Sequence, residues 1–514
     1  MERAIFGNCS CFERSVVMPK RKILLLYPKT GKYDAFVKDL PLGVLCAGRC
    51  AFDAGYDVEI LDQRILPTWK SRLLEVLDKE NPLLVGISVM TGRPIHYALE
   101  LSRFVKKHSQ VPVVWGGIHP TILPDSTIAN DSIDFLIRGP GELPLLTLAK
   151  ALESDPISLA QVDALSYKKN GQIIHNPMGK APEFQDLPDI PYHLVPVEKY
   201  IRFDSDERIF SIITSLGCPH QCAFCYSPLY SGRLWKPEKV EHTIARMEQI
   251  LKKYKPDHFS VIDNDFFVDL RRARALFEAL EKKNWRIKIG FRGARIDELY
   301  RMDDDLLALM ERVGVRYLHI GAESGSQRIL DLMLKKVTTE QIYEVNRKLA
   351  KHPRLMPTYN FFSGVPTETE EDIAATVKMI FRLLEDNPHC QISGFNQFTP
   401  YPGTELFNLS LKHGLKPPQT LEQWTEFDES DCAKNNPWID VRRKRLLDTL
   451  YFTGLFIDNK FHEHYTGRNW KNWAVRQIST IYQPVAKCRF KHRFTGIPVE
   501  LAAKRLADKV FERL

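Results

Sequence analysis

Short, almost purely aliphatic runs alternate with helical stretches along most of this chain, and this alternation constrains its fold more than any other feature. Strands that are apolar throughout, with helices between them, indicate a parallel sheet covered on both faces. Five such units over residues 20–150 predict a doubly wound domain with its ligand site at the carboxyl ends of the strands. The runs in question are 23–27, 58–61, 84–89, 111–115 and 135–137.

A second alternating series starts near residue 208 and predicts a partial (β/α)6 barrel over 205–415, short of a full eightfold barrel. Between the two series, residues 151–204 read as a linker that contains a hairpin, because Asn170-Gly171 separates two short apolar runs. The strand candidates of the second series are 209–214, 258–262, 287–291, 317–320, 359–362 and 393–398.

Both ends of the chain depart from the alternating pattern. Residues 1–19 fit no periodicity and are expected to form an extension. Beyond residue 415 the strand patterns stop and Trp, Arg and Lys become frequent, which predicts a helical C-terminal domain over 416–514. The whole chain is therefore of the α/β class, with two sheet domains followed by helices.

Composition limits the partners and the compartment. The 514 residues, 44% hydrophobic and 26% charged, suit several globular domains and exclude collagen-like or disordered chains. A net charge of +8 is too diluted over this length to indicate a nucleic-acid partner. Ten cysteines are too few for a disulfide scaffold, Glu13 and Arg14 interrupt any apolar leader, and no run is long enough to span a membrane. We therefore expect a cytoplasmic protein without a transmembrane segment.

Three cysteines form the strongest chemical motif. Cys218, Cys222 and Cys225 stand within eight residues, directly after the first strand of the second series. Such a loop can hold three corners of a cubane iron–sulfur cluster, while the fourth iron stays open for another ligand. A zinc site is the alternative, but zinc would want a fourth protein ligand. The motif predicts a [4Fe-4S] cluster on these three thiolates.

This spacing, with Phe224 before the last cysteine, resembles the radical S-adenosylmethionine superfamily. The resemblance extends over about 205–415. It includes motifs with Asp263, Arg292 and Glu323, each of which follows a predicted strand at the edge where barrel active sites lie. Helix capping is the alternative for the aspartates, since Asp265 and Asp269 precede a helix. The resemblance implies an S-adenosylmethionine site made by Phe224, Asp263, Asp265, Arg292 and Glu323.

The first domain has no G-x-G-x-x-G after its first strand, so a nicotinamide cofactor is not expected. Its strand-end loops instead carry glycines, which let a backbone approach a large flat ligand. They resemble the cobalamin-binding domain that precedes the radical core in one subclass of the superfamily. The contacts that this resemblance implies are Ser88, Thr91, Gly116, Gly117, His119, Gly139 and Glu142.

One departure concerns the lower cobalt ligand. No Asp-x-His-x-x-Gly follows the first strand, so the resemblance implies cobalamin bound with its base displaced and without a histidine from that motif. His119 could still interfere as a cobalt ligand, or it could simply begin a helix before Pro120. A doubly wound domain that has lost its cofactor is the remaining alternative.

Together these resemblances imply an enzyme that transfers a methyl group to an unactivated carbon through a 5′-deoxyadenosyl radical. A radical cyclase or rearrangement enzyme, and a non-catalytic cobalamin-binding regulator, are the alternatives. The catalytic residues stay unassigned. The expected partners are a small-molecule or biosynthetic-intermediate substrate and an electron donor such as flavodoxin or ferredoxin, with no nucleic acid.

Overall fold

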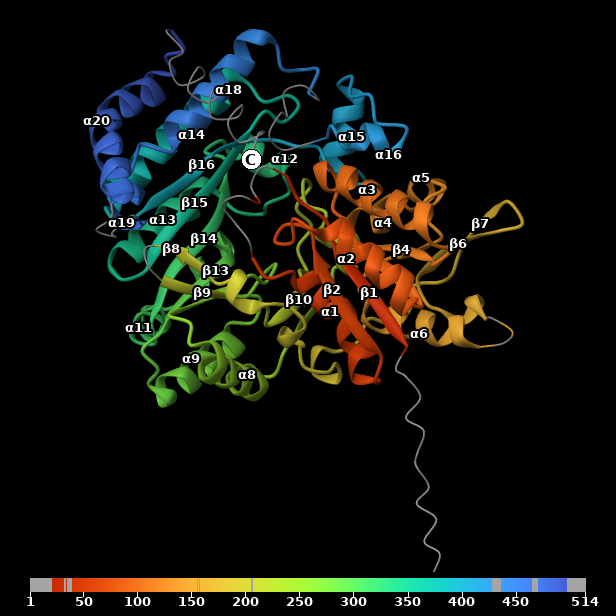
Figure 1. The fold of residues 1–514 in the computed structure, drawn as a ribbon. Coiled ribbons are helices and arrows are strands. Elements are labelled where there is room, and N and C mark those ends of the chain that lie inside the picture. The colour runs from red at the N-terminus through yellow and green to blue at the C-terminus, as the bar shows by residue number, and fades with distance from the viewer. Residues whose placement is uncertain are drawn as a thin grey trace, which may run out of the picture.

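The computed structural model of this chain describes residues 21–31, 34, 39–154, 156, 158–204, 207–427, 436–464 and 470–496. The predicted extension 1–19 and the end of the predicted C-terminal domain, 497–514, lie outside the described residues. Two sheets with their helices stand next to each other, and the last helices lie at the end of the second sheet (Figure 1).

The first sheet is doubly wound, as the alternating pattern predicts. Five strands run parallel in the order β2-β1-β3-β4-β5. Alternate residues of β1 point to opposite faces, so Ile23 and Leu25 pack in one core while Leu24 and Leu26 pack in another. The strands are β1 (Lys22–Tyr27), β2 (Asp57–Asp62), β3 (Leu84–Ser88), β4 (Val113–Gly116) and β5 (Phe135–Ile137).

Helices cover both faces of this sheet. Helices α1 and α6 share the core of Leu25, and α2 and α3 share the core of Leu24. Short helices α4 and α5 fill the crossover between β4 and β5, and one π-helical turn, η2 (Val76–Glu80), extends α2. The helices are α1 (Leu42–Asp53), α2 (Trp69–Glu75), α3 (Arg93–His108), α4 (Ile118–Ile122), α5 (Pro124–Ile128) and α6 (Glu142–Glu153).

The hairpin expected around Asn170-Gly171 is present, and it belongs to the first sheet. Strand β6 (Leu165–Lys169) pairs antiparallel with β5, and β7 (Gln172–His175) pairs with β6. The linker character predicted for 151–204 therefore applies only to the residues after β7. There the chain passes through the short helical turns η4 (Phe184–Asp186), η5 (Tyr192–Leu194) and η6 (Val197–Lys199), and η3 (Leu159–Gln161) precedes the hairpin.

The second sheet is an open half-barrel of six parallel strands with one antiparallel edge strand, β8 (Arg202–Asp204). Its order is β16-β15-β14-β13-β12-β9-β8, so consecutive βα units lie side by side. A small ribbon, β10 (Ser215–Gly217) with β11 (Trp235–Pro237), brackets the cysteine loop. The parallel strands are β9 (Glu207–Ile212), β12 (His258–Val261), β13 (Lys288–Arg295), β14 (Val315–Glu323), β15 (Met356–Ser363) and β16 (Gln391–Gln397).

Local sequence sets where the barrel helices begin. Asp269 caps α9 by accepting the amide N–H groups of Arg271 and Arg272, and Thr338 and Thr369 form capping boxes on α13 and α14. The helices are α7 (Ser227–Ser231), α8 (Val240–Tyr254), α9 (Leu270–Lys283), α10 (Ile296–Arg301), α11 (Asp304–Arg312), α12 (Gln327–Leu332), α13 (Thr339–Ala350) and α14 (Glu370–Asp386).

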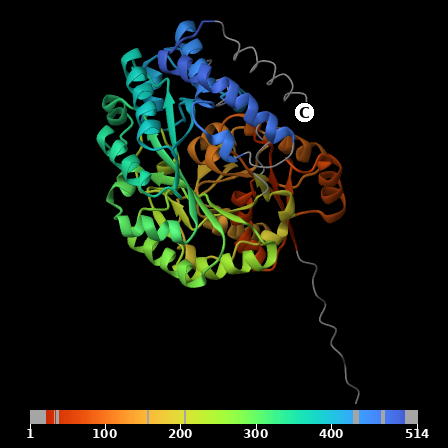
Figure 2. The same cartoon turned by 90° about the vertical axis from the view of Figure 1, so that its left-hand side faces the viewer.

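The later helices pack on both sheet domains. Leu421, Trp424 and Phe427 share a core with α3, whereas Leu447 and Phe490 share the core of the half-barrel. Helices α18 and α20 form an outer layer beside β16 and α14 (Figures 1 and 2). No helix in the described ranges has both the length and the apolarity that crossing a membrane requires. These helices are α15 (Glu405–Lys412), α16 (Leu421–Trp424), α18 (Val441–Gly454), α19 (Lys460–His464) and α20 (Trp470–His492).

Candidate functional site

The cysteine loop leaves β10 through a glycine that no other residue could replace. Gly217 has φ +80°, and a Cβ there would overlap the carbonyl oxygen of Leu234, the residue directly before the facing strand β11. The three cysteines that follow are free thiols, each half-buried. Two backbone hydrogen bonds anchor Ala223 within the loop, one to Met333 and one from Leu406. The triad is thus held on a short, pinned loop at the carboxyl edge of the half-barrel.

The surroundings of the triad suit an anionic metal cluster. Burial raises the pKa of Cys218 to about 12 and also raises that of Cys225, so these thiols stay protonated unless a metal binds them. The guanidinium of Arg295 donates to Sγ of Cys222 over 3.3 Å, and the amide of Ser227 donates to Sγ of Cys225 over 3.4 Å. Three soft donors, two of whose sulfurs accept hydrogen bonds from the protein, fit an iron–sulfur cluster.

Asp265 lies beside the triad in a buried acidic cluster that the sequence did not reveal. Nε2 of His220 is 3.2 Å from Oδ2 of Asp265 and 3.5 Å from Oε1 of Glu298. Burial alone would lower the pKa of His220, but its bonds to the two carboxylates raise it, and burial raises the pKa of Glu298. His220 therefore ties the cysteine loop to α10. The sequence shows His220 between the first two cysteines of the triad, but its partner Glu298 lies far away along the chain.

Asp263 differs from its predicted role as an open ligand for an amino group. Its carboxylate is buried and accepts the Thr214 amide at 2.6 Å, the Thr214 hydroxyl at 2.7 Å and the Ser215 hydroxyl at 2.7 Å. Nor does it cap a helix, since Asp269 is the N-cap of α9. Asp263 instead joins the end of β12 to the segment that leads from β9 into the cysteine loop.

Arg292 and Glu323 lie at the same edge of the barrel, each with a protein partner. Nη1 of Arg292 is 3.1 Å from Oδ2 of Asp39, which precedes α1, so this pair links the two sheet domains. Glu323 has φ +63° and is 2.7 Å from Nζ of Lys335, with both side chains buried. The Lys335 ammonium lies 5.8 Å from the ring centre of Phe224, which packs edge-on against Phe362. Glu323, Lys335 and Phe224 therefore form one group next to the triad.

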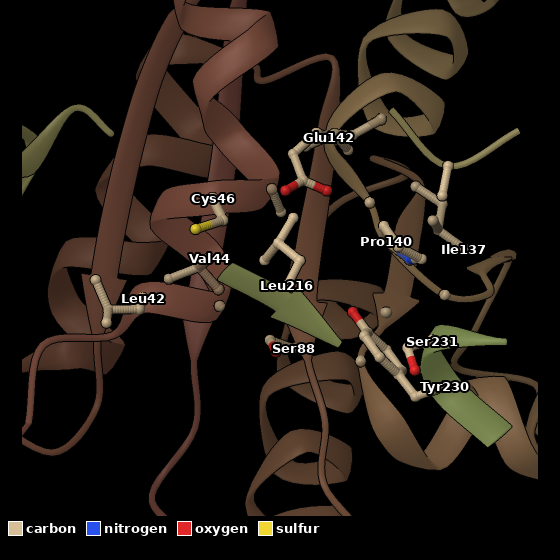
Figure 3. Close-up of a pocket in the computed structure, with 18 of the residues that line it drawn as sticks. Leu42, Val44, Cys46, Ser88, Ile137, Pro140, Glu142, Leu216, Tyr230 and Ser231 are labelled. Carbon is tan, nitrogen blue, oxygen red and sulfur yellow. The ribbon is translucent and has the colours of Figure 1, made fainter. Parts of the chain in front are cut away.

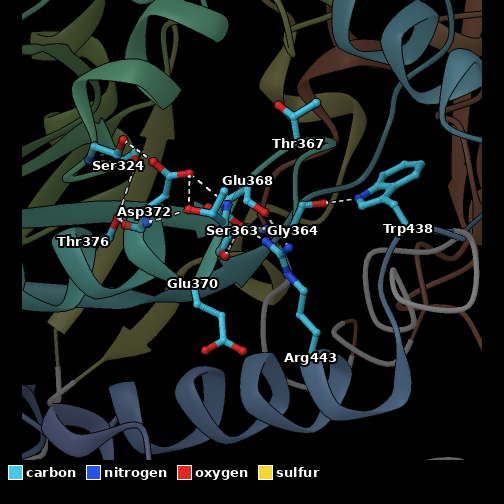
Figure 4. A network of polar contacts seen from close by, with 12 residues as sticks. Ser324, Ser363, Gly364, Thr367, Glu368, Glu370, Asp372, Thr376, Trp438 and Arg443 are labelled. Carbon is cyan, nitrogen blue, oxygen red and sulfur yellow. Dashed lines mark hydrogen bonds and ion pairs between the residues drawn. The ribbon is translucent and has the colours of Figure 1, made fainter.

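The loop after β15 is held by a buried carboxylate (Figure 4). Oε2 of Glu368 accepts the Ser363 hydroxyl at 2.6 Å and the Gly364 amide at 2.7 Å, and it lies 2.8 Å from Nη2 of Arg443 on α18. The indole N–H of Trp438 donates to the Gly364 carbonyl at 2.9 Å. Burial raises the pKa of Glu368, although its bonds to Ser363, Gly364 and Arg443 oppose that effect. The C-terminal helices therefore support the rim of the barrel.

A cavity of about 290 Å³ lies between the two sheet domains (Figure 3). Its first wall includes the first half of α1, the carboxyl ends of β3, β4 and β5 and the start of α6, with Ser88, Gly116, Gly117, Gly139 and Glu142. Its second wall consists of the segment around the cysteine loop. That wall includes Leu216, Gly217, Tyr226, Ser227, Tyr230, Ser231, Leu234 and Lys236. The cavity thus reaches the residue that directly precedes Cys218.

The two glycines at the end of β4 serve different purposes. A Cβ on Gly116 would meet only the Ile137 carbonyl oxygen, at 3.8 Å, so the space in front of this residue is open. Gly117 has φ +97°, and a Cβ there would come within 2.9 Å of the Val89 carbonyl oxygen. Gly116 keeps the cavity open, whereas Gly117 lets the loop turn. At Gly116 the wall therefore offers a ligand open space and backbone instead of a side chain.

His119 and Thr91 do not line the cavity, although the resemblance implies both as cobalamin contacts. His119 is fully buried, its Nδ1 lies 3.2 Å from the Thr91 hydroxyl, and its ring packs edge-on against Trp424. Burial lowers the pKa of His119 to about 3, so the imidazole is neutral. The structure therefore gives His119 the role of a packed helix-start histidine.

Sequence reasoning missed the second wall of the cavity. Tyr226 and Tyr230 follow the last cysteine of the triad by one and five residues; Tyr226 directly precedes α7 and Tyr230 lies within it. Tyr230 lies across the cavity from Glu142 in the close-up view (Figure 3). The short Tyr226-Ser-Pro-Leu-Tyr230 stretch was the available signal, but only the fold brings it against the first sheet.

Two family models match this chain in the order of its two sheets. The model of the B12 binding domain matches residues 39–149, and that of the Radical SAM superfamily matches residues 212–380. An uncharacterized methyltransferase of Pyrococcus horikoshii is 30% identical over 423 residues, 80% of this chain and 88% of the relative. The anaerobic magnesium-protoporphyrin IX monomethyl ester cyclase of Synechocystis sp. is 30% identical over 319 residues, 61% of this chain and 62% of the cyclase.

Solved structures share the fold across nearly the whole chain. The methyltransferase TsrM from Kitasatospora setae, solved with cobalamin and a [4Fe-4S] cluster, has a TM-score of 0.65 at 18% identity. That match covers 91% of this chain and 100% of TsrM. The cobalamin-dependent S-adenosylmethionine radical enzyme OxsB, solved with aqua-cobalamin, has a TM-score of 0.73 at 17% identity, covering 92% of this chain and 72% of OxsB. The arrangement of the two sheets is therefore a known one.

Proposed function

Because this chain belongs to the cobalamin-binding subclass of the radical S-adenosylmethionine superfamily, we propose that it is a methyltransferase that acts on an unactivated carbon of a small molecule. The observation that carries this proposal is the cavity between the two sheets. Gly116 and Gly117 of the first domain face the same space as Gly217, the neighbour of Cys218. A cofactor in this space would lie next to the cysteine loop.

In the proposed enzyme, Cys218, Cys222 and Cys225 hold a [4Fe-4S] cluster and leave one iron for S-adenosylmethionine. Ser88, Gly116, Gly117, Gly139 and Glu142 form the cobalamin-facing wall, with Tyr226 and Tyr230 opposite. Bound together, these cofactors supply a methyl group and a 5′-deoxyadenosyl radical, the chemistry that no side chain can provide. The part of the protein is to hold them close together and away from water.

No histidine lines this cavity within the described ranges. His119 is the histidine nearest in sequence to the glycine loop, and it is buried, neutral and in contact with Thr91. We therefore propose that cobalamin binds with its base displaced and without an imidazole from the protein. Glu142 forms an ion pair with Arg49, whose Nη2 lies 3.0 Å from Oε1 of Glu142.

For S-adenosylmethionine, we propose contacts from Phe224, Asp265, Arg292 and Glu323 at the barrel edge. Asp265 has one buried oxygen, Oδ1, without a hydrogen-bond partner among the described residues, and Arg292 keeps about a third of its side chain exposed. A charged ligand can satisfy such groups. Asp263 acts indirectly, because it holds Thr214 and Ser215, which lead into the cysteine loop.

A radical cyclisation is the second candidate, since the Synechocystis relative is a cyclase with 30% identity over 319 residues. Either reaction needs a reductant, and we propose an electron donor such as flavodoxin or ferredoxin. The two reactions differ in their products from S-adenosylmethionine. Methyl transfer also releases S-adenosylhomocysteine, whereas cyclisation releases only methionine and 5′-deoxyadenosine.

The deciding experiment incubates anaerobic, cofactor-loaded protein with dithionite and S-adenosylmethionine and measures both products by chromatography. We expect 5′-deoxyadenosine and S-adenosylhomocysteine from the natural protein. Cys222→Ala should abolish 5′-deoxyadenosine, while Cys488→Ala, which changes an exposed cysteine, should leave both unchanged. Only 5′-deoxyadenosine would favour the cyclase. Neither product from protein that holds both cofactors would favour a cobalamin-binding regulator.

A further inference from the structure

Helix α20 (Trp470–His492) exposes an apolar face that the proposed reaction does not use. Trp470, Trp473, Ile478, Ile481 and Val485 are exposed by between 50% and 76%. At roughly 100° per residue, these five side chains fall on one side of the helix. We call this set the outward face of α20.

The opposite side of α20 attaches the helix to the protein. Ser479, Ala486 and Phe490 are fully buried, and Phe490 packs against Phe381 and Phe395. The position of the helix is therefore set by one face, and the outward face is not part of the core. Figure 1 shows α20 in the outer layer of the molecule, where it packs beside α18 and α14.

The charges of α20 all have one sign. Its 23 residues include five Lys or Arg and neither Asp nor Glu. Lys487 and Lys491 are exposed on the Trp473 side of the outward face, and the Lys491 ammonium lies 5.7 Å from the ring centre of Phe381. A helix with Trp and Ile on its free side and only basic charges matches a surface that is apolar inside and anionic outside.

We propose that the outward face of α20 docks on an anionic membrane surface. The two indoles at the start of the helix would sit at the level of the lipid headgroups, where aromatic side chains gather, and the isoleucines would enter the acyl boundary. The lysines would contact lipid phosphates. This surface lies outside the cavity between the sheets, and the proposal does not rest on the reaction proposed above.

The test is sedimentation of the full chain with vesicles of mixed phosphatidylcholine and phosphatidylglycerol, compared with vesicles of phosphatidylcholine alone. We expect binding to the anionic vesicles that weakens with added salt, together with a blue shift of tryptophan emission. Exchanging Ile478 and Ile481 for Ser should lower the partition coefficient about tenfold or more, because two side chains that enter the acyl boundary are lost. Exchanging Ile173 and Leu411 for Ser, two exposed apolar residues elsewhere, should leave it unchanged.

Two further variants separate the contribution of the basic charge from that of the tryptophans. Lys487→Glu should weaken binding to the anionic vesicles only. Exchanging Trp470 and Trp473 for Phe should keep binding and remove the emission shift. Equal binding to neutral vesicles, or unchanged binding after the Ile478 and Ile481 exchange, would overturn the proposal. A dimer that this exchange separates would also overturn it, because a second copy of the chain would then cover the face. So would binding that appears only when residues 497–514 are removed, because that segment would then cover the face.

Discussion

Removing Arg443 tests whether the C-terminal helices hold the barrel rim. The side chain of Glu368 is 1% exposed and that of Arg443 is 18% exposed, with 2.8 Å between Oε2 and Nη2. Arg443→Met would leave the carboxylate buried without its cation, which typically costs about 3–5 kcal/mol. We expect about 3 kcal/mol, the lower end of that range, because water can reach the site through the exposed part of Arg443.

The assay is hydrogen exchange at the Gly364 amide, which donates to Glu368 over 2.7 Å. At about 1.4 kcal/mol per decade, a loss of this size speeds local exchange roughly a hundredfold. The matched control is Arg442→Met on the same helix. Arg442 is 86% exposed and lies 3.7 Å from Glu370, and such surface pairs contribute about 0–1 kcal/mol. The control should change the rate by less than about fivefold.

The pH dependence gives a second check on the same variant. Burial raises the pKa of Glu368 in the folded state, and the loss of Arg443 raises it further. A carboxyl group whose folded pKa lies above its unfolded pKa costs stability as pH rises between these two values. The ratio of exchange rates, variant over natural protein, should therefore fall as pH is lowered from 8 towards 5. Equal rates in Arg443→Met and Arg442→Met at pH 8, or a ratio independent of pH, would refute this reasoning.

Three further predictions concern the cofactor sites. Cys218→Ala should lower the iron content of anaerobically reconstituted protein from about four per chain towards zero, as measured by colorimetric iron analysis. Gly116→Trp should abolish cobalamin uptake in a visible-absorption titration, because the indole would fill the open space in front of β4; uptake at the natural level would place cobalamin elsewhere. Asp263→Asn should cost about 1–3 kcal/mol of stability in a thermal melt, because an amide NH₂ would replace a carboxylate oxygen that only accepts. If Asp263→Asn weakened S-adenosylmethionine binding without lowering the stability, Asp263 would be a direct ligand instead.

The sequence predicted the elements well because their signals are local. Buried parallel strands are continuous aliphatic runs, so β1, β3 and β9 are recognisable without any partner. The cysteine loop is likewise a contiguous motif, and the glycines at the end of β4 mark the cavity by their lack of side chains. Each of these features is encoded within a dozen neighbouring residues.

Side-chain partners were less predictable, because they join residues far apart in the chain. The hydroxyl and amide groups that occupy Asp263 belong to Thr214 and Ser215, about fifty residues earlier. An aspartate after a strand has the same local pattern whether it binds a ligand or another strand. His119 shows the same limit, since only the tertiary packing of Trp424 against it reveals that it is buried.

The segment from Gly217 to Ser231 contributes to both halves of the site, the cysteine triad and the wall of the cavity. It carries the three cysteines, then Tyr226 directly after Cys225, and Tyr230 within the short helix α7; both tyrosines belong to the cavity wall. Because Cys225 and Tyr226 are consecutive, the separation between a cluster and a ligand in the cavity depends mainly on this one pinned loop. Bonds from the segment after β9 to Asp263, and from the loop to Met333 and Leu406, fix its position. Substitutions that loosen these bonds should therefore disturb both cofactor sites together, whereas substitutions in β4 should disturb only one.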